Sequence, residues 1–317
     1  TRPAAARRTH GGRLTGSDSA CSLPRMTTTR AGHVALAGAP NAGKSTLLNH
    51  LLGARLAITS AKPQSTRIPA VGILTTDTMQ AVLLDTPGLL DPAYALQRSL
   101  LHMALNALGD ADVAVHVHDA TTGPPPPLAT LLPEGSRVPA TVVPWCNKAD
   151  LLDDATRAAL VAARPDALVG AARTGDAVQA LLARIEAALP VSPFLYPDDE
   201  LSTQPMRFFA TEAIREAAFE VLHEEVPYGV LAEVEEYREE RTPLYVRATL
   251  HVERESQKGI VLGAKGRTIR EIGTRARTKL EELVERPVFL DLWVKVLGEW
   301  RRDERLLKRH GFTLPTD

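Results

Sequence analysis

The segment Gly38-Ala39-Pro40-Asn41-Ala42-Gly43-Lys44-Ser45-Thr46 restricts the possible folds of this chain more than any other part. It fits the pattern G-x-x-x-x-G-K-S/T, a glycine-rich loop that joins a strand to a helix and cradles the phosphates of a nucleotide. An apolar run at residues 34–37 precedes the loop, and residues 45–52 read as the helix that follows. The segment therefore predicts a nucleoside triphosphate site at the end of a buried strand.

The loop offers two kinds of phosphate contact. Its glycines let the backbone approach the anion, and its N–H groups point inward at a helix N-terminus, where negative charge is favoured. Lys44 is expected to reach the β- and γ-phosphates, and the Ser45 hydroxyl to bind Mg²⁺. The residues predicted to hold the phosphates are Gly38, Asn41, Ala42, Gly43, Lys44, Ser45 and Thr46.

From residue 33 onward, short apolar runs alternate with helical stretches, a pattern typical of a parallel sheet wrapped by helices. Further strands are expected at residues 81–84, 113–118 and 140–146. Polar residues follow each of these strands, and open α/β sheets bind ligands at the carboxyl ends of their strands. We therefore expect a doubly wound α/β fold built around the phosphate-binding loop.

Two motifs after these strands select the nucleotide. Asp85-Thr86-Pro87-Gly88 supplies an acid for the Mg²⁺ shell and a glycine N–H that can sense the γ-phosphate. In Asn147-Lys148-Ala149-Asp150, the Asp150 carboxylate accepts two hydrogen bonds from guanine, and Lys148 would lie along the base. Adenine lacks that donor pair and would leave a buried carboxylate unpaired. The motifs therefore predict GTP as the ligand.

A further loop, Val169-Gly170-Ala171-Ala172, is expected to complete the guanine pocket before a helix at residues 177–189. Gly170 stands where such loops usually carry a serine. We therefore expect a looser pocket, in which the Ala171 N–H still faces the guanine O6. The predicted guanine contacts are Asn147, Lys148, Asp150, Gly170 and Ala171.

The polar stretch Lys62-Pro63-Gln64-Ser65-Thr66-Arg67 is interpreted as a nucleotide-sensing loop. In GTPases a threonine in such a loop binds Mg²⁺ while the γ-phosphate is present and is released after hydrolysis. We expect Thr66 to do this, with Ser65 as the alternative, so that Ser45, Thr66 and Asp85 hold the metal. The predicted switch residues are Gln64, Ser65, Thr66, Asp85, Thr86, Pro87 and Gly88.

Leu89 stands where Ras-like proteins carry the glutamine that orients the attacking water. A leucine cannot orient water, so the sequence predicts slow intrinsic GTP hydrolysis unless the backbone, another side chain or a bound cation assists. The side-chain carbonyl of Asn41 is a candidate ligand for K⁺ beside the phosphates. That Asn41 only supports the loop is an equally open alternative.

A proline-rich stretch after residue 189 separates two regions of different charge. We assign residues 30–190 to the GTPase domain, 191–211 to a linker and 212–317 to a second domain. The formal net charge of −1 conceals a basic region in the second domain, because residues 241–280 contain ten Lys or Arg against three Glu, a net charge of +7. Such a concentration of positive charge indicates a nucleic-acid surface.

The second domain predicts the order helix, strand, strand, helix, helix, strand, with strands at residues 230–239, 244–252 and 288–296. Gly263-Ala264-Lys265-Gly266 forms a G-x-x-G turn between the two middle helices, with which K-homology domains clamp about four unpaired nucleotides. We therefore expect an α+β, type II K-homology domain; an ordinary turn before a solvated basic helix is the alternative. The predicted RNA contacts are Lys258, Gly259, Gly263, Ala264, Lys265, Gly266, Arg267 and Arg270.

A GTPase domain followed by a terminal K-homology domain resembles the Era family of ribosome-assembly GTPases. The likeness covers most of residues 31–312. Besides the nucleotide motifs and Gln64-Ser65-Thr66-Arg67, it rests on Glu225-Val226-Pro227-Tyr228, Glu255-Ser256-Gln257-Lys258-Gly259-Ile260 and Leu292-Trp293-Val294-Lys295-Val296. Gly170, His116 and His118 depart from the family pattern, and we interpret the two histidines as buried or edge variation rather than metal ligands.

The resemblance implies a GTP-controlled switch that binds single-stranded RNA near the 3′ end of small-subunit ribosomal RNA during maturation of the 30S subunit. It also implies a cytoplasmic protein that in some members associates loosely, as a peripheral protein, with the inner membrane. We expect a monomer. The rival hypothesis is a membrane-associated GTP-dependent regulator whose last domain binds protein and whose basic face is simply solvated.

Residues 1–29 are expected to form a disordered extension. Residues 1–25 lack the apolar core of a secretory signal, so they are either an organellar transit peptide or a cloning remnant or upstream extension before a start at Met26. Cys21 and Cys146 have neither metal-site nor disulfide spacing, which suits a reducing compartment. No apolar stretch approaches the ~20 residues that span a bilayer.

Overall fold

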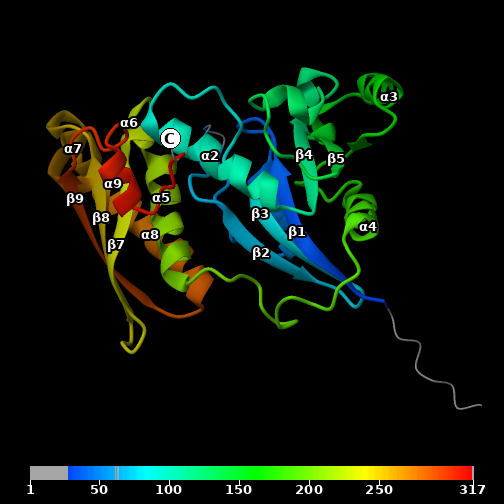
Figure 1. The fold of residues 1–317 in the computed structure, drawn as a ribbon. Coiled ribbons are helices and arrows are strands. Elements are labelled where there is room, and N and C mark those ends of the chain that lie inside the picture. The colour runs from blue at the N-terminus through cyan, green and yellow to red at the C-terminus, as the bar shows by residue number, and fades with distance from the viewer. Residues whose placement is uncertain (1–27, 61, 63, 316–317) are drawn as a thin grey trace, which may run out of the picture.

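The chain forms two bodies that lie side by side (Figure 1). The computed structural model describes residues 28–60, 62 and 64–315. The predicted N-terminal extension, apart from residues 28 and 29, lies outside the described residues. Each body is built around its own sheet, of six strands in the first and three in the second.

The first body is a sheet of order β2-β3-β1-β4-β5-β6, in which all neighbouring pairs are parallel except β2 and β3. Parallel strands are covered on both faces and therefore carry continuous apolar runs, as in β4, whose first five residues are buried. The elements are β1 (Arg30–Ala37), α1 (Lys44–Leu52), β2 (Ala70–Thr75), β3 (Met79–Asp85), α2 (Ala95–Asp110), β4 (Val113–Asp119), η1 (Ala120–Thr122), η2 (Leu128–Leu131), β5 (Thr141–Asn147), η3 (Ala149–Leu151), α3 (Asp154–Ala163), β6 (Leu168–Val169) and α4 (Val178–Ala188).

The central strand β1 shows how helices cover both faces of this sheet. Val34 and Leu36 pack in the cluster that contains α1 and α4, whereas Ala35 and Ala37 pack on the other face with α2. All four side chains are fully buried. The predicted doubly wound fold is therefore confirmed.

Several elements of this body were not among those predicted, among them β2, α2 and α3. β2 turns back through residues 76–78 into β3, and the Thr76 N–H donates to Met79 O at 2.8 Å. A turn this short leaves no room for a crossover helix, so the two strands pair antiparallel. The sheet is therefore mixed, not wholly parallel as the alternation of strands and helices had indicated.

The second body is a sheet of order β7-β8-β9, with α5 and α8 packed on one face. β7 and β8 are antiparallel, whereas β8 and β9 are parallel. Its elements follow the predicted order: α5 (Met206–Val221), α6 (Val226–Gly229), β7 (Leu231–Arg238), β8 (Leu244–Val252), α7 (Glu255–Leu262), η4 (Ala264–Gly266), α8 (Arg267–Val284), β9 (Val288–Val296) and α9 (Glu304–Arg309). α5 begins directly after Pro205, so the helix takes in the end of the segment predicted as linker.

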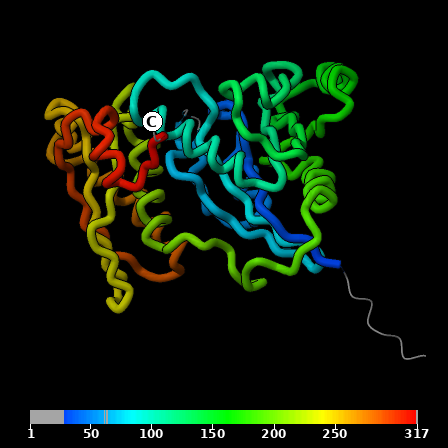
Figure 2. Tube along the Cα trace, viewed as in Figure 1, coloured from blue at the N-terminus to red at the C-terminus, as the bar shows by residue number. Residues whose placement is uncertain are grey.

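The end of the chain returns to the first body. Trp300, Leu307 and Phe312, from α9 and the residues around it, form one buried cluster with Leu96 and Leu100 of α2. Figure 2 shows this C-terminal segment, in red, beside α2. The two bodies therefore share an apolar contact and are not joined by the connecting segment alone.

Candidate nucleotide and RNA sites

The phosphate-binding loop joins β1 to α1, as predicted. Gly38 and Gly43 have φ angles of +154° and +97°. A Cβ on Gly38 would lie 2.0 Å from Val117 O, and one on Gly43 would lie 2.1 Å from Asn147 Nδ2. Both positions therefore require glycine, and the close approach brings the loop against the ends of β4 and β5.

Lys44 is buried beneath this loop, where two main-chain carbonyls accept hydrogen bonds from its ammonium group. Its Nζ donates to Gly38 O at 3.1 Å and to Ala39 O at 2.9 Å. Burial lowers the pKa of the Lys44 ammonium from 10.5 to about 8, and Asp85 opposes that shift. Because desolvation disfavours the charged form, an anion beside the ammonium would be stabilising. The geometry suits the predicted contact with phosphate.

Ser45, Thr66 and Asp85 meet beside the loop although they come from three separate segments. Ser45 Oγ donates to Asp85 Oδ2 at 2.6 Å, Thr66 Oγ1 donates to the same oxygen at 3.0 Å, and the two hydroxyls lie 3.1 Å apart. Asp85 Oδ1 is buried and has no hydrogen-bond partner among the described residues, and burial raises the pKa of this carboxyl. Mg²⁺ takes oxygen ligands of this kind, so the three residues fit the predicted metal.

The other switch residues pack on the same loop. Thr86 is buried, and its Oγ1 donates to a carbonyl of β1 at 2.8 Å. A Cβ on Gly88 would lie 2.7 Å from the Pro40 nitrogen, so glycine permits this contact. Leu89 lies in the core on the α2 side of the sheet. A leucine packed in the core cannot orient a water molecule, and slow intrinsic hydrolysis stays a prediction.

A pocket of about 450 Å³ opens over these groups. Thr66 lies in the oxygen cluster and also lines this pocket, whereas its alternative Ser65 only lines it. The sequence did not single out Ile58, Thr59 or Ser60, whose only signal is that they lie shortly before the polar stretch. The lining residues are Pro40, Asn41, Gly43, Lys44, Ser45, Thr46, Ile58, Thr59, Ser60, Gln64, Ser65, Thr66, Gly88 and Lys148.

Asn147 ties the guanine side of the site to the phosphate loop. Its Nδ2 donates to Ala42 O, and its Oδ1 accepts from the Ala172 N–H, both at 2.8 Å. Lys148, in the left-handed region with φ +66°, donates from Nζ to Asp119 Oδ2 at 2.6 Å. Lys148, directly after β5, lines the pocket, and its contact with Asp119 brings the end of β4 beside it.

Asp150, the residue predicted to read guanine, is paired with Arg173. Arg173 Nη2 lies 2.5 Å from Asp150 Oδ2, and the arginine side chain is 72% exposed. An exposed ion pair contributes about 1 kcal/mol or less. Guanine can therefore take over the carboxylate once Arg173 moves aside.

Gly170 and Ala171 are placed differently from the expected pocket. A Cβ on Gly170 would lie 2.5 Å from Trp145 Cη2 and 2.4 Å from Asp176 O, so the indole already fills the space beside this glycine. The Ala171 N–H donates to Asp176 O at 3.2 Å. This N–H is engaged within its own loop, and contact with guanine O6 would require the loop to rearrange.

In the second body, the G-x-x-G turn lies between α7 and α8. Gly263 has φ +69°, and a Cβ there would lie 2.1 Å from Thr268 Oγ1. Lys265 also takes a left-handed conformation, with φ +54°. Lys258 and Gly259 lie on α7 just before the turn, and Ala264 and Gly266 belong to η4. The predicted RNA contacts are therefore contiguous in space.

A groove of about 430 Å³ runs beside this turn, between α8 and β9. Gly266, Ile269, Arg270 and Arg277 line its α8 side, and Phe289, which is 55% exposed, lines the strand side. Among the described residues, no carboxylate forms an ion pair with four exposed cations of this region: Lys265, Arg267, Arg270 and Arg277. Such charges remain available for phosphates.

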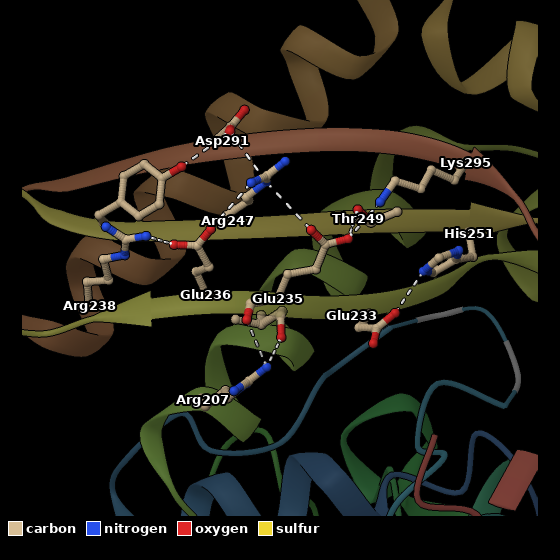
Figure 3. Close-up of polar contacts among 12 residues, drawn as sticks. Arg207, Glu233, Glu235, Glu236, Arg238, Arg247, Thr249, His251, Asp291 and Lys295 are labelled. Carbon is tan, nitrogen blue, oxygen red and sulfur yellow. Dashed lines mark hydrogen bonds and ion pairs between the residues drawn. The ribbon is translucent and has the colours of Figure 1, made fainter. Parts of the chain in front are cut away.

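The outer face of the same sheet is different, because its cations are neutralised. Figure 3 shows Arg247 beside Glu235, Glu236 and Asp291, and Lys295 beside Glu235. Two cations of α8 that face α5, Arg275 and Lys279, are paired as well, both with Glu220. The turn and the groove thus carry uncompensated positive charge, whereas the cations of the outer face shown in Figure 3 are paired.

Two family models match this chain: "50S ribosome-binding GTPase" at residues 33–143 and "KH domain" at residues 220–301. GTPase Era from Geobacter metallireducens is 38% identical over 292 residues, which cover 90% of this chain and 98% of that protein. GTPase Era from Pseudomonas syringae pv. tomato is 39% identical over 294 residues, with the same coverage. The chain belongs to the Era family.

Solved structures of Era extend the likeness to both bodies. An Era variant from Aquifex aeolicus bound to GDP and AlF4⁻ has a TM-score of 0.82 and 32% identity. Era in complex with MgGDPNP and nucleotides 1506–1542 of 16S ribosomal RNA has a TM-score of 0.82 and 33% identity. In both comparisons 90% of this chain and all of the Era chain are covered. The GTPase domain followed by a K-homology domain is therefore confirmed.

Sequence reasoning missed three residues that shape the two sites of this Era family member. Asp119, the partner of Lys148, could have been found because it ends a predicted strand. Arg173, over Asp150, lies in the predicted guanine loop but carries no motif. Phe289 could have been found from the alternation of β9, since the residues on either side of it, Val288 and Leu290, pack on the core. Within the described part of the chain, no helix is both long and apolar enough to cross a membrane.

Proposed function

We propose that this protein is a GTP-hydrolysing molecular switch that binds single-stranded RNA, at the 3′ region of small-subunit ribosomal RNA, during assembly and maturation of the 30S subunit. The observation that carries the proposal is the presence of two sites in one chain. The Ser45, Thr66 and Asp85 cluster lies beside the phosphate loop, and the basic groove lies beside the G-x-x-G turn. The Era relative solved with MgGDPNP and 16S ribosomal RNA nucleotides supports this assignment.

In the nucleotide site, each residue has a role that its position supports. Lys44 would bind the β- and γ-phosphate oxygens, and Asn147 would keep the phosphate loop in register with the guanine pocket. Asp150 would read guanine after Arg173 has released it. Mg²⁺ held by Ser45, Thr66 and Asp85 would supply charge neutralisation on the phosphates.

The switch follows from the same geometry. Thr66 and Gly88 belong to segments outside the helices and strands, and both line the pocket over the phosphate loop. GTP would hold them against the phosphate loop, and hydrolysis would release them. Because Leu89 is buried in the core, we propose slow intrinsic hydrolysis. A K⁺ ion held by Asn41 is one possible aid, and loop support alone is the other role open to Asn41.

We further propose domain limits of 30–190 for the GTPase domain and 206–315 for the described K-homology domain, because α5 begins at Met206 and packs in the second core from Ala210 onward. The family resemblance supports a monomeric cytoplasmic protein. Peripheral association with the inner membrane, as in some family members, would be tested by cell fractionation.

Binding of an RNA oligonucleotide corresponding to nucleotides 1506–1542 of 16S ribosomal RNA tests the proposal. The protein should bind it, and the affinity should fall steeply as salt rises, because phosphate contacts release counterions. Gly263→Asp combined with Gly266→Asp should abolish this binding. Gly298→Asp adds a charge in the same domain at a position with open space around it, and should bind like the wild type. RNA affinity that survives in the double variant would place the RNA elsewhere.

A further inference from the structure

The side chain of Arg67 leaves the nucleotide site and enters the K-homology domain. Arg67 directly follows the Mg²⁺-site residue Thr66 and is 4% exposed. Its Nη1 donates to Val230 O at 2.5 Å, and its Nη2 donates to Tyr228 O at 2.9 Å. Pro227 O lies 3.5 Å from the same Nη2. One guanidinium is thus held by three main-chain carbonyls of the other domain.

These carbonyls come from α6 and the residue that follows it. Carbonyl groups at the end of a helix lack donor partners within it and can accept hydrogen bonds from a cation. Two aromatic rings enclose the same guanidinium, with centroids 5.7 Å (Phe219) and 5.4 Å (Trp300) from its carbon. Trp300 Nε1 donates to Gly229 O at 2.9 Å, which fixes the α6 carbonyls in place. Glu225-Val226-Pro227-Tyr228, a family motif that the two binding sites do not use, supplies part of this carbonyl cage.

The cage does not tolerate partial displacement of Arg67. This side chain is buried, and among the described residues no carboxylate forms an ion pair with it. A buried cation that loses its hydrogen-bond acceptors costs several kcal/mol. Small movements of the two domains would therefore be transmitted to residue 67 and not absorbed there.

Two other contacts hold the same segment to α5. Lys62 Nζ donates to the carbonyls of Phe219 and Leu222 at the end of that helix. Arg55 is paired with Glu216 at 2.8 Å, but its side chain is 52% exposed and lies well before Thr66 in the chain. Of these three anchors, only Arg67 adjoins a residue of the metal site.

We propose that Arg67 is a positioning residue that couples the nucleotide to the RNA-binding domain, by fixing Thr66 in the nucleotide site from the carbonyl cage of residues 227–230. This inference rests on the proposed function and names the residue that connects the nucleotide site with the RNA-binding domain. Consecutive residues then serve two domains, Thr66 facing the nucleotide and Arg67 the K-homology domain. Because coupling between two binding sites is reciprocal, RNA would favour the GTP state by the same factor by which GTP favours RNA.

The test measures the affinity for the 16S oligonucleotide with GDP and with a non-hydrolysable GTP analogue, on the full chain. In the wild type the two affinities should differ at least about 5-fold, the lower range of allosteric coupling. In Arg67→Lys, which keeps the charge but not the planar fork, the ratio should approach 1. Arg67→Met, which leaves no unpaired buried charge, should give the same loss. Arg55→Ala is the matched control, and should keep both the wild-type ratio and the basal hydrolysis rate.

A double-mutant cycle distinguishes an effect of Arg67 on the position of Thr66 from a general loss of stability. If Arg67 acts through Thr66, then Arg67→Lys should change the preference for the GTP analogue over GDP, measured without RNA, in the wild type but not in Thr66→Ala. Additive effects would overturn the inference. If the Arg67 variants do not fold, Trp300→Phe, which removes the hydrogen bond to Gly229 O, should lower the RNA ratio. An unchanged ratio in that variant would contradict the proposal.

The outcomes distinguish the two proposals. A wild type that binds the RNA equally well in both nucleotide states, or Arg67 variants that keep the wild-type ratio, would overturn the coupling role and leave the RNA-binding GTPase standing. A wild type that does not bind the RNA at any salt concentration would remove the proposed function and the coupling with it.

Discussion

Trp145 is among the largest fully buried side chains of the molecule, and its ring limits the size of the residue that fits at position 170. Its ring fills the inner side of the guanine loop at Gly170. The indole therefore already occupies space that the side chain of a serine at position 170 would need. We therefore expect a larger side chain at position 170 to change the packing of the core, and with it the stability of the protein, more than the affinity for guanine.

We predict that Gly170→Ser destabilises the protein by about 1–3 kcal/mol, the usual cost of overpacking. The new Cβ would lie 2.4 Å from Asp176 O, a main-chain atom that cannot move aside cheaply. Guanine nucleotide affinity should fall or stay the same, not rise. Urea denaturation and a nucleotide titration measure the two effects. Gly170→Ser should cost less stability in a Trp145→Leu background than in the wild type, because the indole contact is then absent. Tighter nucleotide binding by Gly170→Ser would contradict this reading.

His116 is a second residue whose effect comes from burial. It is 2% exposed, and its Nε2 has no hydrogen-bond partner among the described residues. Burial, with smaller contributions from His118 and Arg164, lowers the pKa of its imidazole from 6.5 to about 4. The unfolded chain therefore takes up a proton at higher pH than the folded protein does, and stability is lost as the pH falls from about 6.5 towards 4.

We predict that His116→Leu makes the protein less sensitive to acid in this pH range and also more stable at neutral pH, because the unpaired buried nitrogen is removed. His116→Asn is the control: it lacks the titration but keeps a buried polar group, so it should show the weaker acid response without the gain. Unfolding free energies measured at several pH values decide the matter. Parallel curves for wild type and His116→Leu would be inconsistent with the prediction.

Among elements, α8 shows how a helix can be divided by charge as well as by hydrophobicity. Ile272, Ala276 and Leu280 form its buried stripe. Arg275 is neutralised by Glu220 and Glu271, whereas Arg277 lines the groove and lacks an acidic partner among the described residues. Arg275 thus forms ion pairs within the protein, whereas Arg277, two residues further on, is available to bind a phosphate.

This division gives a matched pair of variants. Arg277→Ala should weaken RNA binding and lower the slope of log affinity against log salt by about 1, the loss expected for one phosphate contact. Arg275→Ala should leave that slope unchanged, because its charge is already paired. Filter binding or fluorescence anisotropy at several salt concentrations measures both. Equal effects of the two variants would refute the assignment of the groove.

The elements that could be predicted from sequence are those whose residues carry a strong local signal. The strands β1, β4 and β5 are apolar runs that end in chemical motifs, and α8 has a regular buried stripe. β2 is an edge strand interrupted by Gly72. α2 begins at Ala95, its N-cap residue Tyr94 makes no capping hydrogen bond, and its first turn has no acidic residue. The contacts of Arg67 with residues 227–230 join positions far apart in the chain, and no local pattern encodes them.

At the scale of the whole molecule, the two domains are joined by the cluster of α2 and the C-terminal segment. Phe312 is 3% exposed, and its ring centroid lies 6.3 Å from that of Trp300. The same indole borders the Arg67 cage. Packing at the end of the chain therefore supports the connection between nucleotide and RNA sites.

We predict that Phe312→Ala lowers the free energy of unfolding by about 3 kcal/mol, the lower range for removing a buried phenylalanine. Amide hydrogen exchange in α2 should rise in parallel, since that helix loses its cover. Phe289→Ala, at a position 55% exposed, is the control and should change stability by about 0.5 kcal/mol or less. A Phe312→Ala protein with wild-type stability and wild-type exchange in α2 would show that the cluster does not hold the domains together.

The return of the C-terminal segment to α2 has a consequence for synthesis of the protein on the ribosome. Domains fold as they emerge, the N-terminal one first. Here the GTPase sheet is complete in the growing chain after residue 169, but Leu96 and Leu100 keep an uncovered apolar surface until Trp300 and Phe312 have been made. The first domain thus exposes an apolar patch that can bind other chains during most of the translation of the second domain. This patch is buried only after Trp300 and Phe312 have been made.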